Sequence, residues 1–122
     1  MPLCRSTLAL ASLACAAAAA QVPSPPADAR VLGGEALEAH LAGHVLHWQS
    51  PSGHRFRLQV QRNGFAFIDV DEFRDSGSWR AEADRACWKW REMGEGCNEF
   101  VVAAGRLWIR LAGGKLVPVK VE

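Results

Sequence analysis

The chain has 122 residues, 14 basic and 13 acidic side chains and a formal net charge of +1, so its length leaves room for one domain. The basic residues are mostly arginines scattered along the chain without a basic stripe. This balance disfavours a nucleic-acid binder, which usually carries a basic excess on one surface.

The first 20 residues have the pattern of a cleavable secretory signal. Arg5 is their only charged residue, and an uncharged apolar run covers residues 8–20. The run ends in an Ala-x-Ala sequence, Ala18 and Ala20, which is the kind of site that a signal peptidase cleaves. A membrane-spanning helix needs about 20 apolar residues, so this shorter run disfavours an integral membrane span. We therefore predict an exported protein, periplasmic or secreted.

A second fate for the N-terminus stays open. Residues 11–15, Ala-Ser-Leu-Ala-Cys, resemble a lipobox, in which the cysteine after a small residue is lipidated. Ser12 stands where leucine is usual, and the Ala-x-Ala site follows five residues after Cys15. Soluble export is the favoured interpretation, with a lipid anchor on Cys15 as its alternative.

Cleavage of the signal would reduce the number of cysteines and the net charge of the mature chain. Removing residues 1–20 leaves Cys87 and Cys97 as the only cysteines, and losing Arg5 leaves thirteen basic residues against thirteen acidic ones. In an oxidising compartment such a pair indicates a disulfide. A metal or redox pair would favour Cys-x-x-Cys spacing, whereas nine residues separate these two. We expect a structural bridge worth about 2–3 kcal/mol.

A proline-rich linker and a short helix are expected before the main body of the domain. Residues 21–30 hold three prolines in four positions, which favours an extended tether. Residues 35–42 should form a helix that ends at Gly43, because Leu37 and Leu41 lie four apart on one face. The domain itself is expected over residues 31–122.

The rest of the sequence has the two-residue period of half-buried strands. Apolar and polar residues alternate over 55–61, 106–111 and 117–121. Pro118 places the last strand at an edge or leaves its N–H side unpaired. Turn signals occur at 50–53, 62–64, 75–77, 83–84, 94–96, 104–105 and 113–114.

These signals predict a mainly all-β fold with one short N-terminal helix. About eight short strands should form an antiparallel meander, closed into a small barrel or curled into a half-barrel. The disulfide should join two neighbouring strands across the 94–96 turn.

Part of this pattern resembles a known kind of domain. A Gly-x-Trp sequence, Gly77 to Trp79, is followed by Cys87-Trp-Lys-Trp90 and a second cysteine, Cys97. It is similar to small exported bacterial β-domain proteins of uncharacterised function, which are lipocalin-like in outline. The likeness covers about fifty residues and implies a β fold with a core tryptophan and a disulfide-closed hairpin. It implies nothing specific about function.

One tryptophan is a candidate contact for a partner protein. Trp108 lies on the strand face opposite Leu107 and Ile109, and Arg106 and Arg110 flank it. Tryptophan and arginine are favoured anchors of protein interfaces. A partly covered surface tryptophan is the favoured interpretation, and the partner contact is its alternative.

Two clusters of titratable residues offer weaker signals. His40, His44 and His47 lie close in sequence, followed by His54, and the first two have a spacing that can grip a metal or haem from a helix. Gly43 should end the helix between those two, so surface histidines are the favoured interpretation. An acidic run at Asp69, Asp71, Glu72 and Asp75 lacks calcium-loop spacing and is expected to be solvated.

No catalytic motif is present in the sequence. We therefore predict a non-enzymatic cell-envelope protein without a cofactor, a binding or inhibitor-like module that acts on another envelope or secreted protein. A lipocalin-like carrier of a small apolar ligand is the first alternative, although eight short strands leave little room inside. A histidine-based metal or haem protein is the second.

Overall fold

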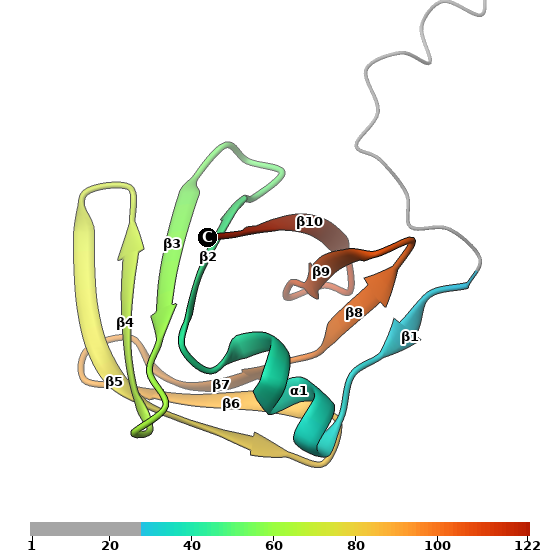
Figure 1. Ribbon diagram of the computed structural model, residues 1–122. Helices are drawn as coiled ribbons and strands as arrows, with labels where there is room; N and C mark the ends of the chain where they lie inside the picture. The colour runs from blue at the N-terminus through green and yellow to red at the C-terminus, as the bar shows by residue number, and fades with distance from the viewer. Residues whose placement is uncertain (1–27) are drawn as a thin grey trace, which may run out of the picture.

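The computed structural model describes residues 28–122, which form one short helix and ten strands (Figure 1). The predicted signal peptide, Cys15 and most of the predicted linker lie outside the described residues. The elements are β1 (Arg30–Val31), α1 (Gly34–Leu41), β2 (His44–Gln49), β3 (Arg55–Val60), β4 (Phe65–Val70), β5 (Phe73–Glu82), β6 (Arg85–Trp90), β7 (Gly94–Asn98), β8 (Phe100–Ala103), β9 (Arg106–Arg110) and β10 (Leu116–Val121).

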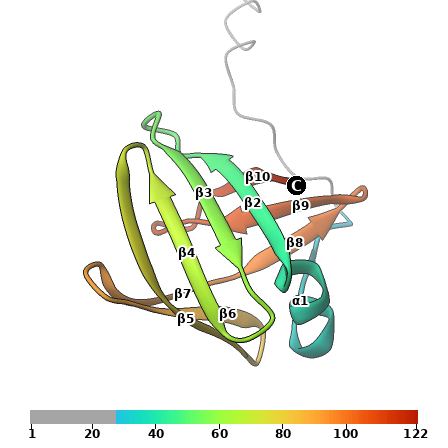
Figure 2. The same cartoon turned by 60° about the vertical axis from the view of Figure 1, so that its left-hand side comes forward.

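All strands belong to one antiparallel sheet in the order β1-β8-β9-β10-β2-β3-β4-β5-β6-β7. The sheet curls into a half-barrel, as Figures 1 and 2 show from two sides. Glu99 alone separates β7 from β8, so the chain itself bridges the two sides of the curl. This architecture confirms the predicted antiparallel half-barrel with a single helix.

The core fills the inside of the curl. Inward residues alternate with outward ones, so Leu107 and Ile109 of β9 pack with Val117 and Val119 of β10. The largest buried side chain with under 2 % exposure is Phe100, at the start of β8. Burial of these side chains supplies the main stabilising free energy of so small a domain.

The helix forms where the sequence predicts it. Leu37 and Leu41 are fully buried and belong to the core, and α1 packs against β2 and β5. Gly43 follows with φ +82°, a conformation that favours glycine, and its N–H donates to the carbonyl oxygen of Val60. The glycine thereby turns the chain from the helix into β2.

Two predicted turns are wrong. Residues 75–77 lie inside β5, and residues 94–96 lie inside β7, whose hairpin turn is at 91–93. Gly77 is needed for close packing of strands rather than for a turn, because a Cβ there would collide with the carbonyl oxygen of Lys89. Glycine in a strand can therefore imitate a turn signal.

The two ends of the domain refine the predictions further. Arg30 was assigned to the linker, yet it pairs with Val102 as the start of β1. Pro118 pairs with Trp108 on one side, whereas β10 meets β2 only from Lys120 onward. The strand is therefore not an edge, and the proline falls where one side of β10 is unpaired, which was the second of the two predicted options.

Candidate functional site

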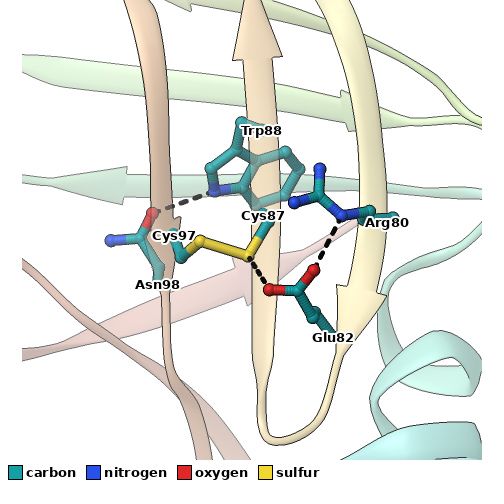
Figure 3. The surroundings of a disulfide bond; sticks show 6 residues. All are labelled: Arg80, Glu82, Cys87, Trp88, Cys97 and Asn98. Atoms are coloured by element: carbon teal, nitrogen blue, oxygen red, sulfur yellow. Dashed lines mark hydrogen bonds and ion pairs between the residues drawn. A yellow bond between two sulfur atoms is a disulfide. The ribbon is translucent and has the colours of Figure 1, made fainter.

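The two cysteines form the predicted disulfide (Figure 3). Cys87 and Cys97 face each other directly in the β6–β7 pairing. Trp88 and Trp90 belong to the core side of β6, so the bridge lies on the outer face. The oxygen Oε1 of Glu82 lies 4.0 Å from the Cys87 sulfur, a contact without a proton because the sulfur is oxidised. The bridge is structural reinforcement of a hairpin.

The predicted partner contact at Trp108 is not supported by its exposure. Its side chain is only 3 % exposed and packs with Val101 and Ala103 in a small second cluster on the outer face of the sheet. The Arg106 guanidinium lies over the ring, 5.7 Å from its centroid. Arg110 is committed to Glu99 at 2.9 Å and to the Gly114 carbonyl oxygen at 2.8 Å. The exposed alternative for Trp108 is wrong, and its burial goes beyond the favoured interpretation of a partly covered tryptophan, because its own strand face carries a second apolar cluster.

The four histidines do not converge. His40 contacts the carbonyl oxygen of Ala36, His47 pairs with Glu122 at 3.0 Å, and His54 pairs with Asp71 at 2.7 Å. His44 and His47 fall on opposite faces of β2, because their separation in the strand is odd. Within residues 28–122, no group of three or more metal-ligating side chains is gathered. The histidine metal site is therefore not formed in the described part of the chain.

Two of these pairs lower the pKa of a carboxyl group. A backbone N–H from Arg55 and the His54 ring hold the pKa of Asp71 below its ordinary value. The pKa of Glu122 is likewise lowered, chiefly by its hydrogen bond with His47. Both pairs are exposed, so they contribute little to stability.

Asp75 differs from the rest of the acidic run because it is buried, with 8 % exposure. Its carboxylate accepts the backbone N–H groups of Ser76, Glu92 and Met93 at 2.8, 3.0 and 2.9 Å. Burial raises the pKa of this carboxyl, but the three donors outweigh that effect and hold it below 3.8. Asp75 thus fixes the turn of the β6–β7 hairpin to β5, and the expectation of a solvated carboxylate was wrong here.

A hollow lies on the outer face of β3 to β6, which we call the outer groove. It consists of two adjoining depressions of about 640 and 520 Å³ that share Phe67, Ser76 and Arg91. Phe65 and Phe67 are 56 % and 42 % exposed, two residues apart on the outer face of β4. The remaining lining residues are Arg57, Gln59, Asp69, Arg74, Asp75, Gly77, Ser78, Lys89, Trp90 and Glu92.

The charges around the outer groove favour cations at its rim. Asp69 is shared by Arg74 at 3.2 Å and Arg57 at 3.9 Å. Lys89 and Arg91 make no ion pair within the described residues. The two exposed aromatic rings therefore lie beside two cationic side chains, Lys89 and Arg91, that make no ion pair within the described residues, although the charge of Arg91 also acts on the Asp75 carboxylate.

A second hollow lies inside the half-barrel, which we call the inner cavity. Its volume is about 140 Å³, and its walls are the apolar side chains of Trp48, Phe56, Leu58, Ile68, Trp88, Trp90, Ile109 and Leu111. Asn98 supplies the only amide of the lining, and the buried indole N–H of Trp48 has no hydrogen-bond partner among the described residues. Trp48 stacks on Phe56 at 5.0 Å between centroids, and Trp88 stacks on Trp90 at 5.8 Å.

Sequence reasoning missed both hollows. The available signal was the run from Phe65 to Ile68, which is apolar at every position although a half-buried strand should alternate. Ala66 and Ile68 fill the core, which leaves the two phenylalanines for the outer face.

Comparison with known proteins adds no assignment. No family model matches the chain, and neither a curated protein nor a solved structure is significantly similar to it. The resemblance to small exported bacterial β domains stays a prediction. Among residues 28–122, α1 is far too short to cross a bilayer as a helix.

Proposed function

We propose that this domain is a non-enzymatic binding module that recognises another envelope or secreted protein through the outer groove. The observation that supports this proposal is the exposure of Phe65 and Phe67, at 56 % and 42 %, side by side in a shallow depression. Neither ring is needed for the core, because Ala66 and Ile68 fill the inner side of β4. Exposed aromatic side chains gathered in this way are typical of interaction sites.

The cationic rim defines the kind of partner surface. Interfaces favour aromatic and arginine anchors at their centres, and charges at the rim steer association and fix orientation. With Lys89 and Arg91 unpaired at the rim, the matching surface should present an apolar side chain flanked by carboxylates. An inhibitor of a secreted hydrolase is one role that such a rigid surface serves without catalytic groups.

The test compares capture of partner proteins from a cell-envelope extract by the wild-type domain and by a Phe65→Ser/Phe67→Ser variant. Loss of two anchors should reduce recovery of a specific partner at least about tenfold. Val31→Ser is the matched control, because Val31 is also exposed, at 45 %, but lies on β1 outside the groove. Equal recovery of the partner by the wild-type domain and by the Phe65→Ser/Phe67→Ser variant would show that the outer groove is not the binding surface.

The inner cavity favours a second candidate function, the binding of a small apolar ligand. A volume of about 140 Å³ is close to that of an engineered protein cavity that binds benzene, and below the roughly 300–1,000 Å³ of sites for larger ligands. This candidate therefore concerns a ligand of one ring or a short chain, rather than a lipid.

A further inference from the structure

Asn98 is the one side-chain amide in the lining of the inner cavity, which also includes the buried indole N–H of Trp48, unpartnered among the described residues, and the orientation of the amide is fixed. The Trp88 indole N–H donates to Asn98 Oδ1 at 2.9 Å, and Asn98 Nδ2 donates to the carbonyl oxygen of Arg110 at 2.9 Å. These two bonds determine which end of the amide carries the nitrogen. A side-chain amide has two N–H donors and an oxygen with two lone pairs. Asn98 therefore keeps one donor and one acceptor position uncommitted within the described residues.

The cavity is reached through the open side of the half-barrel. A groove of about 490 Å³ runs between β7 and the turn that joins β9 to β10. The groove and the inner cavity share Trp88, Trp90, Asn98 and Leu111. Asn98 thus lies where the groove meets the cavity, so a ligand that enters through the groove passes its amide.

We propose that the inner cavity binds a benzene-sized ring that carries one hydroxyl group, with the Asn98 amide as the polar contact of that hydroxyl. The apolar walls accept the ring, and a hydroxyl both donates and accepts, which matches the two uncommitted positions of the amide. Phenol is the simplest molecule of this class. The proposal rests on the second candidate function, and it is independent of the outer groove.

The test titrates the folded domain with phenol and with benzene and follows the indole N–H signals of the tryptophans by NMR. Both probes should shift the signals of Trp48, Trp88 and Trp90, which line the cavity, and leave that of Trp108 unchanged. Asn98→Leu should weaken phenol binding about tenfold and change benzene binding by less than about twofold, because it removes a hydrogen bond but keeps an apolar wall. Equal losses for both probes, or no loss for phenol, would overturn the role of Asn98.

A second variant keeps the proposal testable if Asn98→Leu does not fold. Leu111→Phe should fill the cavity and abolish binding of both probes, whereas Val121→Phe, at an exposed position outside the cavity lining, should leave it intact. Binding that survives Leu111→Phe would place the site elsewhere and overturn the proposal. If the wild-type domain binds neither probe, the second candidate function falls too. If benzene binds but phenol binds no more tightly than benzene, and Asn98→Leu weakens neither, the cavity still binds an apolar ligand and only the preference for a hydroxyl-bearing ring is wrong.

Discussion

At the scale of single residues, Asp75 shows how one buried carboxylate can hold a loop. The Arg91 N–H at the start of the β6–β7 turn donates to the Ser76 carbonyl oxygen of β5. The next two N–H groups of the turn, those of Glu92 and Met93, both donate to the Asp75 carboxylate, which ties the rest of the turn to β5. The turn also carries Glu92, which belongs to the rim of the outer groove. The shape of that groove thus depends on a residue that a partner need not touch.

We expect Asp75→Asn to lower the free energy of unfolding at pH 7, because an amide presents an N–H where the turn presents N–H donors. Since the folded pKa of Asp75 is below 3.8, the wild-type carboxylate stabilises the fold fully above that value, and its contribution is lost as the pH falls through the folded pKa. The difference in free energy of unfolding between the wild-type protein and Asp75→Asn, measured by urea titration, should therefore become smaller towards pH 3.

Asp84→Asn is the matched control for this experiment. Asp84 is exposed, and its carboxylate has no hydrogen bond among the described residues. Asp84→Asn removes a carboxylate without removing a hydrogen bond, so it should leave the free energy of unfolding at pH 7 close to that of the wild-type protein. If the difference in free energy of unfolding between the wild-type protein and Asp75→Asn stays constant from pH 7 to pH 3, the charge of Asp75 does not hold the turn.

At the scale of elements, the β6–β7 hairpin combines a disulfide, a buried tryptophan and a tight turn. Cys87 and Cys97 join its two strands on the outer face. The Trp88 side chain packs into the core on the opposite face of β6, and its indole N–H donates to Asn98 (Figure 3). The same hairpin contributes to the outer groove and to the inner cavity. Its stability therefore bears on both candidate sites.

Replacing both cysteines by alanine should lower the free energy of unfolding by about 2–3 kcal/mol, because the bridge no longer restricts the unfolded chain. Urea denaturation with and without reductant checks this. Reductant should bring the wild-type protein to the stability of the Cys87→Ala/Cys97→Ala variant and leave the variant unchanged. A wild-type protein that is equally stable under both conditions would show that the bridge does not contribute to stability.

The strands could be predicted from sequence because the two-residue period is a local property, and the helix because Leu37 and Leu41 mark one short face. Gly77 was misread because its role depends on the Lys89 carbonyl of a neighbouring strand. The burial of Trp108 likewise depends on residues of β8, so its exposure could not be inferred from alternation within β9. Sequence reasoning failed where tertiary contacts decide.

At the scale of the whole molecule, the curl of the sheet creates both candidate sites. The outer groove lies on the outside of β3 to β6, and the inner cavity lies within the curl beside the opening next to β7. The two sites share Trp90, yet they face different sides of the sheet. A partner protein outside and a small ligand inside are therefore compatible occupants.

Export is the whole-molecule prediction on which the choice of partner depends. Cleavage after Ala20 should give a mature chain that begins at Gln21, and mass spectrometry of the protein from its native cells measures this directly. A chain that begins at a lipid-modified Cys15 would indicate an anchored protein instead. An unprocessed Met1 would contradict export, and with it the class of partner proposed here.

Partner binding through the outer groove can be tested in the cell by photo-crosslinking. A photo-crosslinking amino acid is placed at Phe67 and, separately, at Val31, and the producing cells are illuminated. We expect a covalent adduct with one partner protein from position 67 and none from position 31. Excess wild-type domain should compete for the adduct, whereas the Phe65→Ser/Phe67→Ser variant should not. The absence of an adduct at position 67, or the same adduct at both positions, would show that the outer groove does not bind a partner.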